Sequence, residues 1–322
     1  MSISKEKSDK IYNRYIELKN SAIYKKGFIQ KILQDEFQLP RSTAFDHSRG
    51  REKNSKNYKV FQPVISAVTD NKDTKLTQPK TLFFDIETMA NLSWVWGKYD
   101  QNVIDFEREW YVLCFCYKWG NSDEVNSVSL PDFKESFQKD KTNDYYVVKK
   151  MWELFDEADI VIAHNGDQFD IKKMNARFLY HGFPPPSPFK SIDTKKVAKR
   201  YFNMNSNKLD DIGRYLGLGR KVVNTGWDLW KRCSVGDVNA WNDMIEYNKM
   251  DVILLEKIYY AFRPYMNNHP NMNLYQDTTH NCPNCGSYSL QKRGMSLTRV
   301  SKSQRYQCTD CGAYSQGNKM LR

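Results

Sequence analysis

The segment Leu82-Phe83-Phe84-Asp85-Ile86-Glu87-Thr88 joins a short apolar run to two acidic residues. The apolar run suits a buried β-strand. Side chains two residues apart on a strand point to the same face, so Asp85 and Glu87 should lie side by side. Two neighbouring carboxylates at the end of a buried strand repel each other unless a cation neutralises them. The segment therefore predicts a strand that ends in part of a cation site.

Alternating strand and helix patterns extend from this segment toward the C-terminus. A rigid loop is expected at Pro184-Pro185-Pro186. Apolar periodicity predicts strands at 110–119, 123–130 and 159–164, and helices at 145–155, 169–180, 209–216 and 238–260. Three strands, a helix, a strand and further helices describe an α/β domain with a mixed sheet.

Two further acids stand where they could join the first pair. Asp170 begins the helix that follows the strand at 159–164, and Asp251 lies on the last long helix, four residues after Tyr247 on the same helical face. Four acids from three elements could hold two Mg²⁺ or Mn²⁺ ions roughly 3.5–4 Å apart. Taken singly, each has a plain alternative: Asp170 as a helix N-cap, and Asp251 as a solvated helix residue.

Taken together, three segments resemble the exonuclease motifs of the DEDD superfamily. They are Asp85-Ile86-Glu87-Thr88, Asn165-Gly166-Asp167-Gln168-Phe169-Asp170 and Tyr247-Asn248-Lys249-Met250-Asp251. Tyr in place of His in the third segment points to the branch that includes polymerase proofreading domains. The chain is most similar to stand-alone exonucleases of bacteria and phages that resemble the family-B proofreading domain. The segment from Lys208 to Gly219 also looks like the part between their second and third motifs.

The second motif is slightly long, which leaves Asp167 as an alternative to Asp170. The preceding Phe169 favours Asp170. The resemblance covers residues 81–264, and the chain is too short to house a polymerase as well.

The resemblance implies an RNase H-like fold and hydrolysis of a 3′-terminal nucleotide by two metal ions. Asp85, Glu87, Asp170 and Asp251 would be the ligands, and Tyr247 would orient the attacking water. Nucleic-acid contacts are expected at Asn165 and Lys208. DNA, single-stranded or at its 3′ ends, is the expected substrate. The alternatives are an RNA-trimming exonuclease on the same fold and a nucleic-acid-binding regulator whose nuclease-like domain is inactive.

Four of the seven cysteines form two CxxC pairs near the C-terminus. Cys282-Pro283-Asn284-Cys285-Gly286 and Cys308-Thr309-Asp310-Cys311-Gly312 each end in a glycine, which permits a tight turn around a metal. Four thiolates at this spacing predict a closed structural Zn²⁺ site in a zinc ribbon. His280 could replace one of the thiolates, but the four cysteines already complete the site, so we interpret it as a bystander. The hairpin between the pairs carries Lys292, Arg293 and Arg305 near tyrosines, which suits nucleic-acid binding, although a solvated hairpin would look similar.

Helical periodicity is also present at residues 11–39, and a turn at Gln38-Leu39-Pro40 precedes a second short helix. This part resembles a helix-turn-helix, and a plain helical hairpin fits the pattern too. In the first interpretation the DNA-contacting residues are Arg41, Ser42, Thr43 and His47.

The net charge of +11 is concentrated at the two ends of the chain. Residues 1–80 hold 17 Lys and Arg against 9 Asp and Glu, and residues 265–322 hold 7 against 2. The middle, 81–264, holds 25 against 27. Basic flanks around a near-neutral centre suit a protein that holds a phosphate backbone with its ends and keeps catalytic acids between them. Basic ends that only keep the protein in solution are the alternative.

These observations predict four parts: a helical segment at 1–55, a linker at 56–80, the α/β domain at 81–264 and a zinc ribbon at 265–322. No apolar run approaches the ~18 residues that span a bilayer, and residues 1–10 have no apolar stretch like that of a signal peptide. We expect a soluble cytoplasmic protein without a membrane partner, in the host cytoplasm if a phage encodes it.

Overall fold

The computed structural model describes residues 78–99, 102–221, 225–276 and 280–320, with Lys10, Arg14, Leu33, Glu36 and Phe37 near the N-terminus. The chain divides into two compact units, Met1–Gln62 and Pro63–Arg322. The five described residues of the first unit are helical, and Leu33 is buried. The predicted DNA-contacting residues of this unit lie outside the described residues: Arg41, Ser42, Thr43 and His47. Most of the predicted linker does too.

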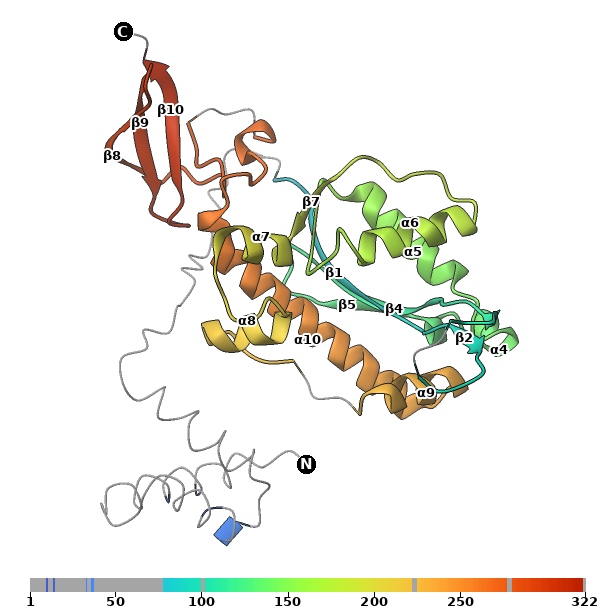
Figure 1. Ribbon diagram of the computed structural model, residues 1–322. Helices are drawn as coiled ribbons and strands as arrows, with labels where there is room; N and C mark the ends of the chain where they lie inside the picture. Colours follow the sequence, from blue (N-terminus) through green and yellow to red (C-terminus); the bar gives the residue numbers. More distant parts are fainter. Residues whose placement is uncertain are drawn as a thin grey trace. The chain divides into compact units, whose positions relative to one another are not determined.

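The second unit is built on a five-stranded mixed sheet with the order β5-β4-β1-β6-β7 (Figure 1). The strands are β1 (Thr81–Thr88), β4 (Val112–Trp119), β5 (Asn126–Ser129), β6 (Ile160–Ala163) and β7 (Lys190–Asp193). β4 pairs antiparallel with both β1 and β5, whereas β6 is parallel to β1 and β7 is parallel to β6. This arrangement confirms the predicted RNase H-like mixed sheet.

Helices cover both faces of the sheet, and each face has its own apolar core (Figure 1). One face packs against α5 (Tyr145–Glu157) and α6 (Asp170–Tyr180). The other packs against α7 (Thr194–Tyr201), α8 (Leu209–Leu216) and the long α10 (Val238–Phe262). The short α4 (Lys134–Lys139) and α9 (Trp227–Val235) complete the helices of the domain. No helix of the described part is both long and apolar enough to cross a membrane.

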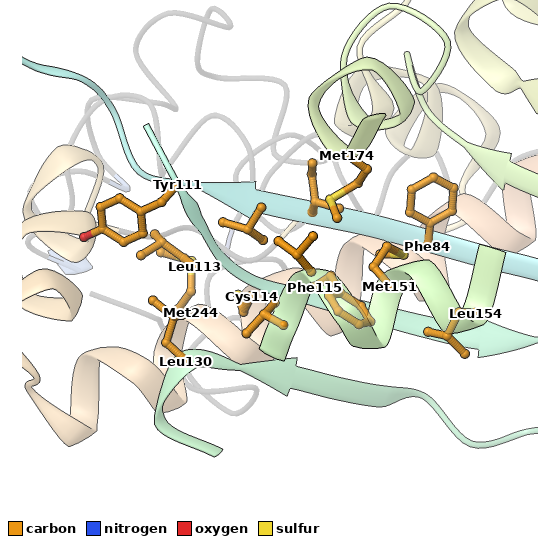
Figure 2. Packing of buried hydrophobic residues seen from close by; sticks show 14 of the residues in the cluster. Phe84, Tyr111, Leu113, Cys114, Phe115, Leu130, Met151, Leu154, Met174 and Met244 are labelled. Carbon is orange, nitrogen blue, oxygen red and sulfur yellow. The ribbon is translucent and has the colours of Figure 1, made fainter. Parts of the chain in front are cut away.

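The alternation of β1 divides its side chains between the two cores. Phe84 belongs to the first core, where it lies beside Met151 and Leu154 of α5 (Figure 2). Phe83 belongs to the second core, under α10. Asp85 and Glu87 have the parity of Phe83, so the backbone directs them to the α10 side of the sheet. The pairing of β1 with β4 shifts between Glu87 and Thr88, where the regular ladder ends.

The predicted strands and helices of this domain are present, with their ends displaced by a few residues. The strand expected at 123–130 is shorter, because Leu130 already begins a 3₁₀ helix, Leu130–Asp132. β7 was not predicted, because Ile192 is its sole strongly apolar side chain. Three further elements were not predicted: α7, half of whose eight residues are Lys or Arg, and the exposed hairpin of β2 (Leu92–Trp94) and β3 (Asp105–Arg108).

The C-terminal part is a three-stranded antiparallel sheet with the order β10-β9-β8. Its strands are β8 (Leu290–Leu297), β9 (Lys302–Cys308) and β10 (Tyr314–Met320). The hairpin predicted between the two cysteine pairs is therefore present. The first pair contacts the end of α10, because Asn284 Nδ2 donates to the carbonyl oxygens of Arg263 and Met266 at 3.0 and 3.3 Å.

The apolar core beneath β1 should be sensitive to truncation. Phe84 is fully buried and packs edge-on against Phe155 with ring centroids 5.0 Å apart. We expect Phe84→Ala to lower the free energy of unfolding by about 3–5 kcal/mol, measured by urea denaturation. The control Leu179→Ala removes a side chain that is 82% exposed on α6, and should change it by less than about 0.5 kcal/mol. Equal effects would contradict this description of the core.

Candidate metal sites

Carboxylates from β1 and α10 meet on one face of the sheet. Oxygen atoms of Asp85, Glu87 and Asp251 all lie within 4.8 Å of one another. Asp251 is only 1% exposed, so its interpretation as a solvated helix residue is wrong. Its Oδ1 is buried and has no hydrogen-bond partner in the described part of the chain. This buried carboxylate oxygen has lone pairs that accept no hydrogen bond, and it lies beside two more carboxylates. Oxygen atoms of this kind are the ligands that hard divalent cations prefer.

Asp170 reaches the same region from the start of α6. It is 3% exposed, and its Oδ1 accepts a hydrogen bond from the backbone N of Ile86 at 3.3 Å, between the two acids of β1. The N-cap of α6 is Phe169, so Asp170 is not the cap of its helix. Asp167 instead forms an ion pair with Lys196 at 2.7 Å and accepts from the hydroxyl of Ser191. Asp170, and not Asp167, is therefore the acid that the structure brings to β1.

A strained turn at Asn165 and Gly166 leads from β6 to Asp170 at the start of α6. Asn165 has a φ of 71°, the one positive φ at a non-glycine residue of the described ranges. Its backbone N donates to Asp193 Oδ1 at 2.9 Å, at the end of the neighbouring strand β7. At Gly166 any Cβ would lie 2.5 Å from that of Ala163, so the close approach requires glycine. The two residues fold the chain tightly between β6 and α6.

Burial and mutual repulsion disfavour ionisation of these acids. Burial raises the pKa of Asp85 well above its ordinary value, and the charges of Asp170, Glu87 and Asp251 raise it further. Burial and then Asp251 raise the pKa of Glu87 to about 8. Burial also raises the pKa of Asp170 to about 7, although the backbone N of Ile86 opposes this. A bound cation would reverse the effect by favouring the ionised forms.

Lys221 supplies positive charge to the cluster, and the sequence analysis did not identify it. Its Nζ forms an ion pair with Asp251 and lies 3.2 Å from the hydroxyl of Tyr247. Burial alone would lower the pKa of Lys221, but Asp251 and Asp85 hold it above its ordinary value, so the side chain is charged. Lys221 follows a glycine-rich turn without periodicity, so no sequence signal placed it near the acids.

Tyr247 lies one helical turn before Asp251 and faces the same cluster. Its hydroxyl accepts a hydrogen bond from Lys221 Nζ at 3.2 Å. Burial, followed by the charge of Asp251, raises the pKa of Tyr247 to about 12, so the hydroxyl keeps its proton at neutral pH. A second unpredicted neighbour is Asn248, whose Nδ2 donates to Asp85 Oδ2 at 2.7 Å.

The other predicted contact residues are spread over the surface. Asn165 lies at the turn before Asp170, and Lys208 is exposed at the N-cap of α8. Three cations on the C-terminal sheet are exposed: Lys292, Arg293 and Arg305.

The four C-terminal cysteines form a second candidate metal site, separate from the acids. The sulfurs of Cys282 and Cys311 are 3.6 Å apart, and those of Cys285 and Cys308 are 3.7 Å apart. Four sulfurs at about 2.3 Å from one tetrahedral centre lie about 3.8 Å from each other, so the spacing fits a tetrathiolate site. Gly286 and Gly312 have φ angles of 78° and 79°, as the predicted knuckle turns require. The arrangement is that of the predicted zinc ribbon.

One family model matches the domain built on the five-stranded sheet. The family model of the RNase_H superfamily matches residues 82–263. No curated protein matches the sequence. The similar solved structures include the family B DNA polymerase from the hyperthermophilic archaeon Pyrobaculum calidifontis, with 12% identity and a TM-score of 0.42. The likeness covers 70% of this chain and 32% of that one, so the chain spans about a third of the polymerase.

The raised pKa values of Glu87 and Asp170 predict how pH acts on the protein without Mg²⁺ or Mn²⁺. In the folded state the pKa of Glu87 is about 8 and that of Asp170 about 7, against ordinary values of 4.5 and 3.8. At a pH between the ordinary and the folded pKa values, the folded state therefore binds more protons than the unfolded state. Stability should therefore fall as pH rises from 6 to 8, on the order of 1 kcal/mol per pH unit. Added Mn²⁺ should raise the melting temperature more at pH 8 than at pH 6.

Glu87→Gln provides the control for this pH dependence, because the amide cannot ionise. The other titratable residues are the same in both proteins, so the difference between wild type and variant isolates the contribution of Glu87. A metal-free wild type whose stability changes with pH as the variant's does would mean that the site does not raise the pKa of Glu87.

Proposed function

Since the chain belongs to the RNase_H superfamily, we propose that it is a metal-dependent 3′→5′ exonuclease that hydrolyses phosphodiester bonds of DNA. The observation that carries the proposal is the meeting of Asp85, Glu87 and Asp251 within 4.8 Å, with Asp170 hydrogen-bonded to the strand between the first two. The polarity rests on the resemblance of the three motif segments to those of DEDD exonucleases. The same residues serve DNA and RNA exonucleases of this fold, so RNA trimming is the second candidate.

The four acids would hold two Mg²⁺ or Mn²⁺ ions. Bound there, the ions would supply an activated water and stabilise the charge on the leaving oxygen. Carboxylate oxygens suit these cations, and the unpartnered Oδ1 of Asp251 is a ready ligand. In their absence Lys221 offsets part of the negative charge through its ion pair with Asp251.

Tyr247 and Lys221 would act on the water and the phosphate. The Tyr247 hydroxyl keeps its proton and accepts a hydrogen bond from Lys221, so it can orient a water beside the acids. The Lys221 ammonium can leave Asp251 when cations bind, and contact the negatively charged phosphate instead. The role of Tyr247 is thus orientation, and that of Lys221 is charge compensation.

The C-terminal ribbon would bind one structural Zn²⁺ and part of the nucleic acid. Four cysteines leave no open coordination position for catalysis. Lys292, Arg293 and Arg305 are exposed on β8 and β9, where phosphate contacts would raise affinity without touching the acids. Asn165 and Lys208 are proposed as contacts near the acids. The N-terminal residues 1–55 are proposed as a further DNA-binding segment.

The two neighbouring aspartates of the second motif provide the test of the proposed activity. Asp170→Ala should lower the rate of nucleotide release from single-stranded DNA by a factor of order a thousand or more, because a cation ligand is lost. Asp167→Ala is the matched control, which should stay within about threefold because Asp167 pairs with Lys196. Release is measured from DNA and RNA labelled at the 3′ or 5′ end, with Mn²⁺ and then with EDTA.

Three outcomes of this assay would each contradict a different part of the proposal. Equal rates for Asp170→Ala and wild type would reject the acid assignment. Loss of the 5′ label before the 3′ label would reject the polarity. Binding without any release by the wild type would favour a nucleic-acid-binding regulator with an inactive nuclease-like domain.

The role proposed for the ribbon cations predicts a change in salt dependence. Replacing Lys292, Arg293 and Arg305 together by Ala should reduce the slope of log K against log salt for single-stranded DNA by roughly 2, at about 0.7 per lost contact. Cleavage at saturating substrate should remain near wild type, because the acids are untouched. Lys257→Ala, at an exposed lysine of α10, is the control, and one zinc per chain should be retained. An unchanged slope with intact zinc would mean that the ribbon does not bind the backbone.

A further inference from the structure

Asn248 is a polar side chain where the helix presents its apolar face. It is fully buried on α10. The residues one turn before and after it, Met244 and Val252, are fully buried too, and Leu255 follows on the same face at 1% exposure. The periodicity of the helix therefore calls for an apolar residue at position 248.

Among the described residues, the amide of Asn248 makes one hydrogen bond, and its partner is a candidate metal ligand. Nδ2 donates to Asp85 Oδ2 at 2.7 Å, between residues 163 positions apart in the chain. When Asp85 is ionised, as cation binding requires, the opposite orientation would place two acceptor oxygens at that distance, so the amino group faces the carboxylate. Oδ1 of Asn248 is buried and has no hydrogen-bond partner in the described ranges.

The fold itself gains little from this residue. A buried amide with one of its two polar ends unpaired destabilises the folded state, whereas leucine is of similar size and would pack against the apolar neighbours. Asparagine at this position is therefore explained by its contact with Asp85, if the orientation of that carboxylate matters to the site. Asp85 lies at the centre of the acid cluster, with an oxygen within 4.8 Å of oxygens of Glu87 and Asp251.

We propose that Asn248 is a positioning residue that sets the rotation of the Asp85 carboxylate for cation binding. The amide occupies Oδ2, which fixes the plane of the carboxylate and leaves Oδ1 as the atom offered to a divalent cation. Donors of this kind orient the carboxylates that bind metals and tune their affinity. The inference rests on the proposed function, because it concerns the same acids. It adds a residue that touches neither substrate nor cation, yet determines how well the cation is held.

The test is direct binding of Mn²⁺ to the zinc-loaded full chain without substrate, by isothermal titration calorimetry. Two variants lack the donor but differ in packing: Asn248→Leu fills the space and Asn248→Ala leaves it open. Both should weaken Mn²⁺ binding by about 10–100-fold. Asn239→Leu makes the same change at an exposed position of the same helix, and should bind Mn²⁺ as the wild type does.

A nuclease assay on the same proteins separates positioning from a structural defect. If Asn248 positions Asp85, the variants should need about 10–100-fold more Mn²⁺ for half-maximal activity, and regain much of the wild-type rate at saturating Mn²⁺. A purely structural role would lower the melting temperature and leave the Mn²⁺ affinity within about threefold of wild type. That result in either folded variant overturns the inference.

Failure of the inference is distinguishable from failure of the proposed function. A wild type that binds Mn²⁺ and releases nucleotides, with variants of equal affinity, rejects Asn248 alone. A wild type that neither binds Mn²⁺ nor cleaves DNA or RNA rejects the function on which the inference rests, and the inference with it.

Discussion

Repulsion among partly buried carboxylates is the constraint around which the second unit is organised. Asp85, Glu87 and Asp251 come within 4.8 Å of one another, and Asp170 is fixed to the same strand. Such a cluster destabilises a fold unless protons or cations neutralise it. The backbone holds the acids together against this repulsion, since they come from a central strand and two helices packed on opposite faces of the sheet. Local strain at Asn165 and the close packing of Gly166 belong to the same arrangement.

α10 connects the acid cluster to the first cysteine knuckle. It carries Tyr247, Asn248 and Asp251 within five successive positions. Tyr247 and Asp251 both contact Lys221, and Asn248 contacts Asp85. Its end receives two hydrogen bonds from Asn284 of the first cysteine knuckle. The helix that completes the acid cluster is thus also the support for the ribbon. Metal chemistry at the two sites nevertheless differs, because one offers oxygen ligands and the other four sulfurs.

Much of the fold and of the acid cluster was predictable from local pattern. The run at β1 and the periodic α8 and α10 are apolar enough to identify, and the two-residue spacing of Asp85 and Glu87 places them on one face. β7 and α7 were not predicted, because their many polar residues leave too few apolar ones to show the strand or helix periodicity. Lys221 and Asn248 were missed for another reason. Their roles depend on tertiary contacts with residues 30 and 163 positions away, and no local periodicity encodes such contacts.

The central claim is that these acids hold the divalent cations that carry hydrolysis. The most direct measurement is anomalous X-ray diffraction from crystals of the zinc-loaded protein soaked in Mn²⁺. We expect two manganese peaks roughly 3.5–4 Å apart among the four acids, with the Lys221 ammonium displaced from Asp251. Absence of manganese at the acids, with the ion pair of Lys221 and Asp251 unchanged in saturating Mn²⁺, would contradict it.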